Sequence, residues 1–244
     1  MSDFCFEEEA ALAGGAAGRN ACGTAAAPAR DGRGQSRRER EAPLGRRPHR
    51  ACGPCVRGLC LGGTAVRKVI CFGDSNTWGY DPRSWLGGRY APDSRWVDIL
   101  AAETGWTVGN WGANGREIPA AAPDIPADTD LLIVMLGTND LLQGRSPGAA
   151  AERMERFLTG LELAPEKVLL IAPPPLSPGE WVTDQPLIAA SQTFARCCRT
   201  LAGRLGIRFA DAGRWNVSPA YDGVHFTEQG HRAFAAGLLK EIAP

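Results

Sequence analysis

From Val66 onward, the chain of 244 residues predicts an α/β domain with a five-stranded, parallel, doubly wound sheet. Three observations support this prediction. Strand and helix signals alternate along the sequence, as a parallel sheet requires, because each crossover between parallel strands needs a long connection. Residues 131–136 are apolar without alternation, which is typical of a strand covered on both faces. The segments between the expected strands carry apolar residues at helical spacing.

The first half of this domain contains three expected strands. Residues 68–72 form the first, which ends at the small, turn-forming residues 73–75. A polar loop with several aromatic side chains then precedes a helix near 94–104, and a glycine directly after that helix is a stop signal. Residues 106–111 and 131–136 are the second and third expected strands.

The second half begins with a helix. Ser146 followed by Pro147 is typical of a helix N-terminus, and apolar residues then recur at i, i+3, i+4 and i+7. Residues 168–171 predict the fourth strand, and the three prolines at 173–175 require an extended exit from it.

The remaining elements follow the same alternation. A long helix from about residue 187 ends at Gly206 and leads into a fifth strand at 207–210. The last helix begins after Thr227, and we expect His231 on its surface.

The charge distribution separates two regions. Formal net charge is zero, so no global field favours nucleic acid or an anionic membrane. Residues 1–64 are rich in arginine, glycine and alanine and contain almost no aromatic side chains, so they have little apolar surface to offset chain entropy. We expect a disordered N-terminal extension at 1–64 and a folded domain at 65–244. The arginines of the extension lack interleaved aromatics, which favours a solvated charged run over a nucleic-acid tether.

No apolar run reaches the length of about 18 residues that a membrane span needs. Glu7, Glu8 and Glu9 have the wrong sign for a secretory signal. We therefore expect a cytoplasmic protein. An internal start near Val66 would leave the domain without the extension.

The eight cysteines favour thiols over disulfides. Cys71 falls within an expected strand and Cys197-Cys198 within an expected helix, so we expect buried thiols there. Residues 52–55 have the Cys-x-x-Cys spacing of a redox dithiol and, with His49 and Cys60, could coordinate zinc. Nothing before Cys52 resembles the strand that normally precedes a redox pair, so we favour chance cysteines.

Candidate catalytic residues follow four of the expected strands. Ser75 follows the first, Gly115 the second and Asn139 the third, while Asp222 and His225 lie in the loop after the fifth. Ligands of a doubly wound sheet bind beyond the C-terminal strand ends, so these residues can meet at one edge. A serine nucleophile needs a base, a group that orients the base, and donors for the oxyanion. The sequence therefore predicts a serine esterase.

These residues resemble the conserved blocks of the SGNH (GDSL) hydrolases. The blocks are, in order, Gly73-Asp74-Ser75, Gly115, Gly137-Thr138-Asn139-Asp140 and Asp222-Gly223-Val224-His225-Phe226. The resemblance spans about Val66 to the C-terminus and keeps block order and spacing. It implies a flavodoxin-like three-layer fold with a five-stranded parallel sheet.

Within that family the chain most resembles the arylesterase/acyltransferase branch. The segments that carry this similarity are 73–79, 90–96, 173–176 and 222–228. Some members of the branch transfer acyl groups to alcohols or peroxide as well as to water, and some assemble into oligomers. The resemblance permits acyl transfer and a homo-oligomer in this chain.

We predict that His225 takes the proton of Ser75 during attack on an ester carbonyl and that Asp222 orients the imidazole. The resemblance assigns the oxyanion hole to the backbone N–H groups of Ser75 and Gly115 and the side-chain amide of Asn139. Gly112, three residues before Gly115, is the alternative glycine.

Trp78, Tyr80 and Trp181 fall in loops that can wall a substrate pocket, although capping of the sheet edge explains them equally well. Asp74 and Asp140 are expected to brace their loops by accepting backbone hydrogen bonds, and tuning of the site by either carboxylate is the alternative. We expect no cofactor and no metal, since the domain shows neither a ligand cluster nor a phosphate-binding glycine loop.

Several functional alternatives stay open. Within hydrolases they are a carbohydrate O-acetyl esterase and a thioesterase, which use the same catalytic group. From another class, the domain could be a non-catalytic module that only binds an acyl or sugar ligand. The expected partner is a small-molecule ester, and neither nucleic acid nor a membrane is expected.

Overall fold

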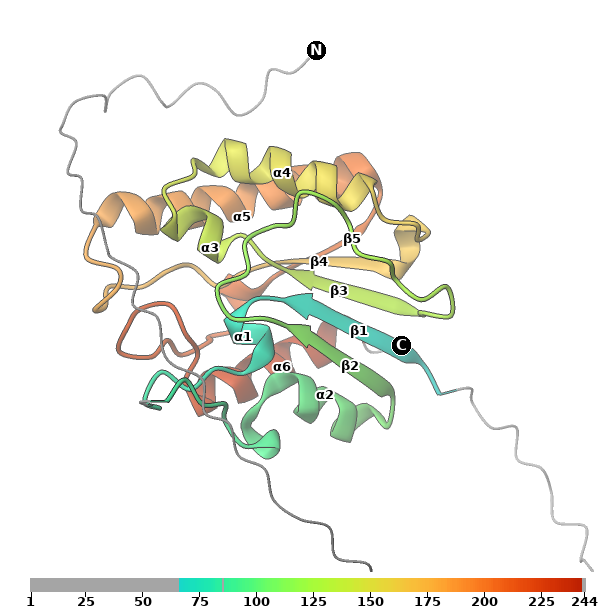
Figure 1. Ribbon diagram of the computed structural model, residues 1–244, viewed down its shortest axis with the longest axis horizontal. Coiled ribbons are helices and arrows are strands. Elements are labelled where there is room, and N and C mark those ends of the chain that lie inside the picture. The colour runs from blue at the N-terminus through green and yellow to red at the C-terminus, as the bar shows by residue number, and fades with distance from the viewer. Residues whose placement is uncertain (1–65, 85, 243–244) are drawn as a thin grey trace, which may run out of the picture. The chain divides into compact units, whose positions relative to one another are not determined.

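A five-stranded sheet forms the centre of the computed structural model, which describes residues 66–84 and 86–242. All strands are parallel and lie in the order β2-β1-β3-β4-β5 (Figure 1). The strands are β1 (Lys68–Gly73), β2 (Thr107–Gly112), β3 (Leu131–Met135), β4 (Val168–Ala172) and β5 (Arg208–Asp211). The predicted parallel sheet is confirmed. Strand order reverses between β1 and β3, and this switch point is where such sheets bind ligands.

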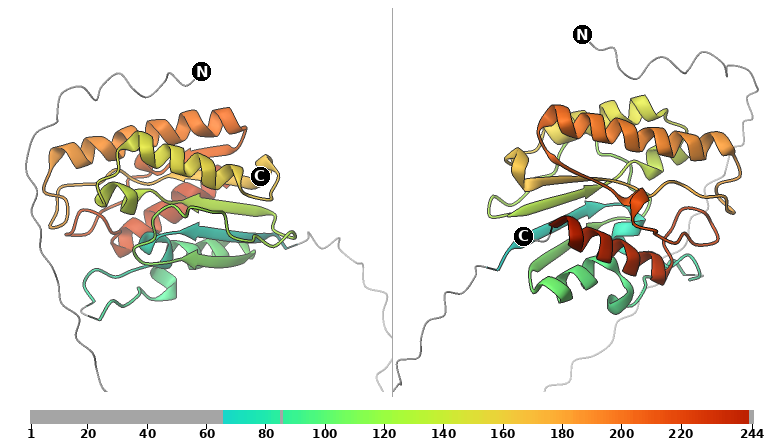
Figure 2. Two further views of the ribbon diagram at one scale, coloured as in Figure 1. Left: turned by 45° about the horizontal axis from the view of Figure 1, so that its top comes forward. Right: turned by 180° about the vertical axis from the view of Figure 1, so that it is seen from behind.

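Helices cover both faces of the sheet and complete three layers (Figures 1 and 2). Helices α2 (Trp96–Thr104) and α6 (Glu228–Ile242) pack on one face, and α4 (Pro147–Thr159) and α5 (Gln185–Leu205) on the other. The short elements are α1 (Ser75–Trp78), α3 (Thr138–Leu142), η1 (Pro92–Ser94), η2 (Pro165–Lys167) and η3 (Ala212–Arg214). Among the described helices, none is long and apolar enough to cross a membrane.

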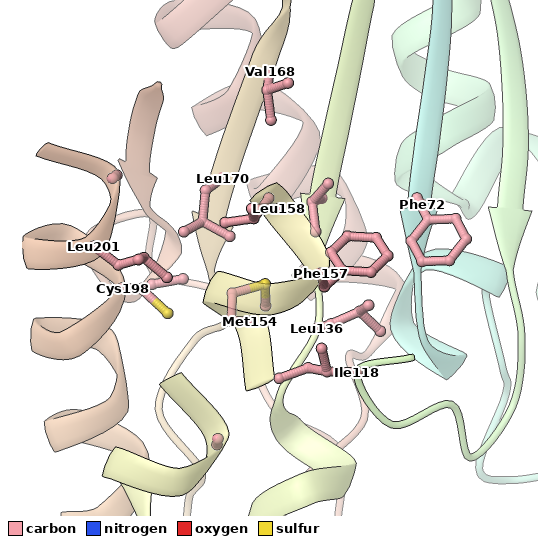
Figure 3. Close-up of a cluster of buried hydrophobic side chains, with 14 of the residues drawn as sticks. Phe72, Ile118, Leu136, Met154, Phe157, Leu158, Val168, Leu170, Cys198 and Leu201 are labelled. Atoms are coloured by element: carbon pink, nitrogen blue, oxygen red, sulfur yellow. The ribbon is translucent and has the colours of Figure 1, made fainter. Parts of the chain in front are cut away.

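Each face of the sheet has its own apolar core. Leu132 and Val134 of β3 pack with α4 and α5, whereas the alternate residue Ile133 packs with α2 and α6. Figure 3 shows the first cluster, in which the rings of Phe72 and Phe157 stack with centroids 5.4 Å apart. Successive strand residues point to opposite faces, so a strand buried on both sides must be continuously apolar.

Element boundaries differ from the predicted ones by a few residues. Helix α5 begins at Gln185, before Pro186, because proline fits the first helical turn, where its missing N–H would have no partner. Residues 92–94 form a separate 3-10 turn before α2. Gly105 and Gly206 end α2 and α5 in the left-handed conformation, which confirms both as stop signals.

The expected surface position of His231 is wrong. Its side chain is 0 % exposed and lies between the rings of Tyr90 and Phe226, each with its centroid 5.3 Å away. The helical period of α6 shows which residues share a face, but it does not show that the segment near Tyr90 covers part of that face. The covering contact joins Tyr90 and His231, which lie more than a hundred positions apart in the chain.

Cys71 and Cys198 are buried thiols, as predicted, and burial raises the pKa of both. Cys197 is also buried. The predictions for the extension at 1–64, including the pair Cys52 and Cys55, lie outside the described residues.

Candidate active site

The turn from β1 into α1 presents Ser75 at the C-terminal edge of the sheet. Asp74 caps α1, since its carboxylate accepts the backbone N–H of Asn76 at 3.0 Å. A Cβ at position 73 would lie 2.8 Å from the carbonyl oxygen of Met135, so only glycine fits where strand and helix meet. Asp74 thus braces its loop as expected, and burial raises its pKa to about 6.

Ser75, His225 and Asp222 form a chain of hydrogen bonds. The Oγ of Ser75 lies 3.0 Å from Nε2 of His225, and Nδ1 of His225 lies 2.7 Å from Oδ2 of Asp222. The three residues are 6 %, 4 % and 0 % exposed, respectively. This order matches a nucleophile, a base and the group that orients the base.

Asp222 is held as a carboxylate. Burial alone would raise its pKa, but hydrogen bonds from the His225 ring and from the backbone N–H groups of Val224 and His225 lower the pKa below its ordinary value. An ionised Asp222 fixes the proton of His225 on Nδ1, which leaves Nε2 free to accept the proton of Ser75.

The groups predicted to form the oxyanion hole have N–H donors that no protein group in the described part of the chain uses. Within the described residues, the N–H groups of Ser75 and Gly115 donate to no other protein group. Asn139 donates one N–H of its side-chain amide to the carbonyl of Arg116 at 3.0 Å, which leaves its second N–H available. Gly115 has a φ of 68°, a left-handed conformation that favours glycine. By contrast, the N–H of Gly112 is already bonded to Asn110 Oδ1 at 2.9 Å.

Sequence reasoning missed Arg116. Its guanidinium donates to the carbonyl of Gly73 at 3.0 Å and to that of Trp111, and it lies over the Phe72 ring at 4.4 Å. These bonds satisfy carbonyls at the ends of β1 and β2, while the Arg116 carbonyl holds the Asn139 amide. Only its place directly after Gly115 could have drawn attention to it.

Two of the three predicted pocket aromatics contact the imidazole. The ring centroids of Tyr80 and Trp181 lie 4.6 Å and 5.2 Å from that of His225, and Trp181 is 52 % exposed. Trp78 packs elsewhere, with the Arg89 guanidinium 5.0 Å over its ring. Among the described residues, the rings paired with His225 are those of Tyr80 and Trp181, and the Trp78 ring is not one of them.

The loop after β4 holds Trp181 in place. Backbone N–H groups of Ser177 and Trp181 donate to the carbonyls of Gly223 and Asp222 at 3.0 and 3.1 Å. A Cβ at Gly179 would collide with the backbone at Asp222, so the glycine permits this close approach. The exposed tryptophan and the loop that contains Asp222 and Gly223 are therefore joined by hydrogen bonds.

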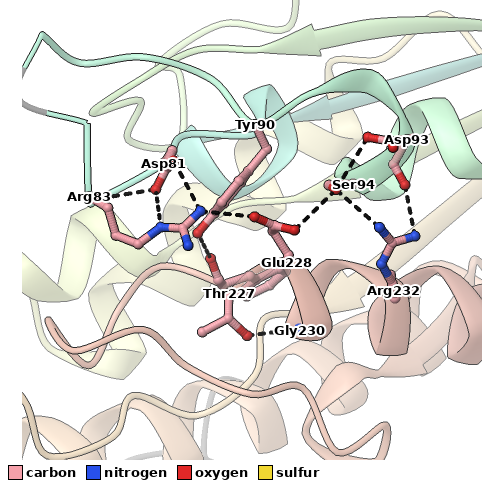
Figure 4. A network of polar contacts seen from close by, with 10 residues as sticks. Asp81, Arg83, Tyr90, Asp93, Ser94, Thr227, Glu228, Gly230 and Arg232 are labelled. Atoms are coloured by element: carbon pink, nitrogen blue, oxygen red, sulfur yellow. Dashed lines mark hydrogen bonds and ion pairs between the residues drawn. The ribbon is translucent and has the colours of Figure 1, made fainter.

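A polar network fastens the loop that contains Tyr80 to the start of α6 (Figure 4). Glu228 accepts a hydrogen bond from Arg83 at 2.9 Å and one from Ser94 at 3.4 Å. The Tyr90 hydroxyl donates to the carbonyl of Phe226, which directly follows His225, at 3.2 Å. These contacts place the aromatic loop beside the His225 segment.

Asp140 braces the connection between β2 and β3. Its Oδ2 accepts the backbone N–H of Ile118 at 2.8 Å, and its Oδ1 lies 3.2 Å from Arg145. This bracing role was expected from sequence. No group of three His, Cys, Asp or Glu side chains that could hold a metal occurs in the described residues.

A serine, a histidine and a buried carboxylate linked at the C-terminal edge of a parallel sheet define a serine hydrolase site. Residues 71–233 match the model of the GDSL-like lipase/acylhydrolase family. The chain belongs to this family and is a serine ester hydrolase that acts on a small-molecule ester.

Solved structures with the same fold include an aryl esterase from M. smegmatis, which is 30 % identical and has a TM-score of 0.62. The aligned region covers 72 % of the present chain and 98 % of the esterase chain. A carbohydrate acetylesterase family member from Sinorhizobium meliloti is 27 % identical, with a TM-score of 0.61 and coverage of 73 % and 100 %. No curated protein sequence matches the chain.

Proposed function

We propose that the protein hydrolyses short-chain aryl and alkyl carboxylic esters through an acyl-serine intermediate. The observation that carries this proposal is the hydrogen-bonded series from Ser75 through His225 to the ionised Asp222. In the first half-reaction, Nε2 of His225 takes the Oγ proton as Oγ bonds to the carbonyl carbon. The imidazolium then gives that proton to the alcohol oxygen as the ester C–O bond breaks. Water repeats the sequence in the second half and releases the acid.

The negative charge on the tetrahedral intermediate requires donors already in place. The open N–H groups of Ser75 and Gly115 and the second amide N–H of Asn139 supply them. The occupied N–H of Gly112 favours Gly115 for this role. Arg116 contributes indirectly, because its carbonyl orients the Asn139 amide.

The aromatic residues favour substrates with a flat alcohol portion. His225 must reach the leaving oxygen, so Tyr80 and Trp181, which contact its ring, border the leaving-group side. The half-exposed Trp181 offers a face on which an aryl or sugar ring can stack. A carbohydrate O-acetyl esterase is therefore the second candidate, supported also by the name of the Sinorhizobium meliloti structure.

The proposal is tested by hydrolysis of p-nitrophenyl acetate, butyrate and octanoate, with Ser75→Ala beside the unchanged chain. We expect turnover to decrease from acetate to octanoate and the variant to lose at least about 10³-fold in kcat. Equal activity of both proteins would exclude Ser75 as the nucleophile. Inertness of both towards aryl esters, with deacetylation of an acetylated sugar, would favour the second candidate. Ligand binding without any turnover would favour a binding module.

We also propose that the protein is cytoplasmic and forms a homo-oligomer. A further proposed activity is acyl transfer to alcohols or peroxide. The zero formal net charge supports the absence of nucleic-acid partners. Light scattering of the purified chain tests the assembly, and ester formation in alcohol-containing buffer tests acyl transfer.

A further inference from the structure

Asn76 directly follows the nucleophile and uses both ends of its side-chain amide. Its Nδ2 donates to the carbonyl of Val224 at 3.1 Å, and its Oδ1 accepts the backbone N–H of Phe226 at 2.9 Å. The two partners are the residues on either side of His225. The side chain is only 4 % exposed, so water does not replace these bonds easily.

The backbone of Asn76 is held as firmly as its side chain. Its N–H donates to Asp74, and its carbonyl accepts the indole N–H of Trp96 at 2.9 Å. Trp96 is fully buried in α2. The side-chain amide of Asn76 therefore extends from a fixed backbone toward residues 222–226, the histidine loop.

Other polar contacts of the histidine loop go to segments outside α1, such as the bond from the Tyr90 hydroxyl to the Phe226 carbonyl. The Asp222 carboxylate bonds within the loop, and Ser177 and Trp181 tie it to the segment after β4. Among the described residues, the hydrogen bonds between α1 and residues 222–226 are those of Asn76 and the Ser75–His225 pair itself.

We propose that Asn76 is a positioning residue, whose amide grips the backbone on both sides of His225 and sets Nε2 opposite Ser75 Oγ. This inference rests on the proposed roles of Ser75 and His225. Proton transfer needs the two heavy atoms at hydrogen-bond distance, and a displacement of about 1 Å can cost about 10²-fold in rate. The two amide bonds join segments separated by 148 and 150 positions in the chain.

The test replaces Asn76 with leucine, which is close in shape but cannot hydrogen-bond. We expect Asn76→Leu to lower kcat for p-nitrophenyl acetate by about 10²-fold with KM within about threefold. Its residual rate should keep rising with pH instead of reaching the plateau that a histidine base produces. A purely structural role would not remove that plateau.

Asn110 provides a matched control. Its amide also makes two bonds, from Nδ2 to the Thr77 carbonyl at 2.9 Å and from the Gly112 N–H to Oδ1, but it does not touch the histidine loop. Asn110→Leu should keep kcat within about threefold and retain the pH plateau. Equal losses in both variants, or unchanged kcat and plateau in Asn76→Leu, would overturn the proposal.

Two further measurements keep the outcome unambiguous. If Asn76→Leu does not fold, Asn76→Asp takes its place, because its carboxylate still accepts the N–H of Phe226. Its kcat should lie between that of the unchanged chain and a value about 10²-fold lower. Full activity of this variant would again overturn the proposal. Ser75→Ala is measured in parallel. An active Ser75→Ala removes the proposed function itself, whereas an inactive Ser75→Ala beside a fully active Asn76→Leu removes only the role of Asn76.

Discussion

The amide of Asn139 illustrates how much a single side chain decides in this site. One of its N–H groups is held by the Arg116 carbonyl, so the other has a defined direction before any charge develops. A preorganised donor costs little reorganisation during the reaction, which is why such donors act mainly on kcat. Arg116 helps to fix that direction, because its guanidinium bonds to the ends of β1 and β2 while its own carbonyl accepts the Asn139 amide.

We expect Asn139→Ala to reduce kcat by about 10²–10³-fold while KM changes by less than about threefold. The physical reason is the loss of one oxyanion donor, with the triad intact. Steady-state kinetics with p-nitrophenyl acetate measure both constants. Asn110→Ala, which also removes an amide bonded to a backbone carbonyl, is the control and should leave kcat nearly unchanged. A decrease confined to KM would argue against an oxyanion role.

At the scale of elements, α6 carries an unusual group in its first turns. His231 is fully buried, neither of its ring nitrogens has a protein partner, and desolvation lowers its pKa to about 3. The nearby charges of His225 and Arg95 act in the same direction. The folded state therefore keeps His231 neutral, whereas an unfolded chain would protonate it below its ordinary pKa of about 6.5.

This depressed pKa predicts a loss of stability in acid. Between pH 6.5 and the folded pKa, the unfolded state binds the extra proton, so the free energy of unfolding falls as pH falls, by up to about 1.4 kcal/mol per pH unit. We expect His231→Phe to reduce the stability lost between pH 7 and 4.5 by about 2–3 kcal/mol. Urea unfolding at both pH values measures it. An equal loss in both proteins would refute the assignment to His231.

Two glycines near the C-terminus of α5, one inside the helix and one capping it, allow the effect of backbone conformation to be measured apart from that of available space. A Cβ would meet nothing within 4 Å at either Gly203 or Gly206, but only Gly206 has a positive φ, of 66°. We expect Gly206→Ala to lower the free energy of unfolding by about 1–2 kcal/mol and Gly203→Ala to raise it by about 0.5–1 kcal/mol. Thermal or urea unfolding measures both, and kcat should not change. Equal effects would show that the left-handed C-cap is not needed.

At the scale of the whole molecule, sheet order decides where the site lies. Strand β1 pairs with β2 on one side and β3 on the other, so the loops after all three strands meet around Ser75. The histidine loop follows η3, which comes directly after the edge strand β5, and it leads into α6. The loops after β1, β2, β3 and β5 therefore carry the predicted site residues Ser75, Gly115, Asn139 and His225 at the C-terminal ends of the strands.

The family match and every proposed catalytic group lie within residues 71–233. We therefore expect a chain that begins at residue 65 to keep kcat/KM for p-nitrophenyl acetate within about twofold of the full chain. Parallel assays of the two purified proteins measure this ratio. The same truncation carrying Ser75→Ala is the background control. A large loss in the truncated chain, with the fold intact by circular dichroism, would assign a functional role to residues 1–64.

Much of the architecture was predictable from sequence because its signals are local. Continuous apolar runs marked β3 and β4, prolines and glycines marked helix ends, and period-3.6 stripes marked α4 and α5. The order of Ser75, Gly115, Asn139, Asp222 and His225 along that alternation was sufficient to predict a serine esterase and its family. Their roles, the N-terminal extension, the oligomer and the cytoplasmic location stay predictions.

Tertiary structure decided what depends on contacts between distant segments. It buried His231 beneath Tyr90, turned Trp181 rather than Trp78 toward His225, and joined Asn76 to the backbone on both sides of the histidine. Periodicity identifies the face on which a side chain lies, but not the segment that covers that face. The sequence by itself therefore determined the elements and the chemical groups of this protein, and only packing decided which groups touch.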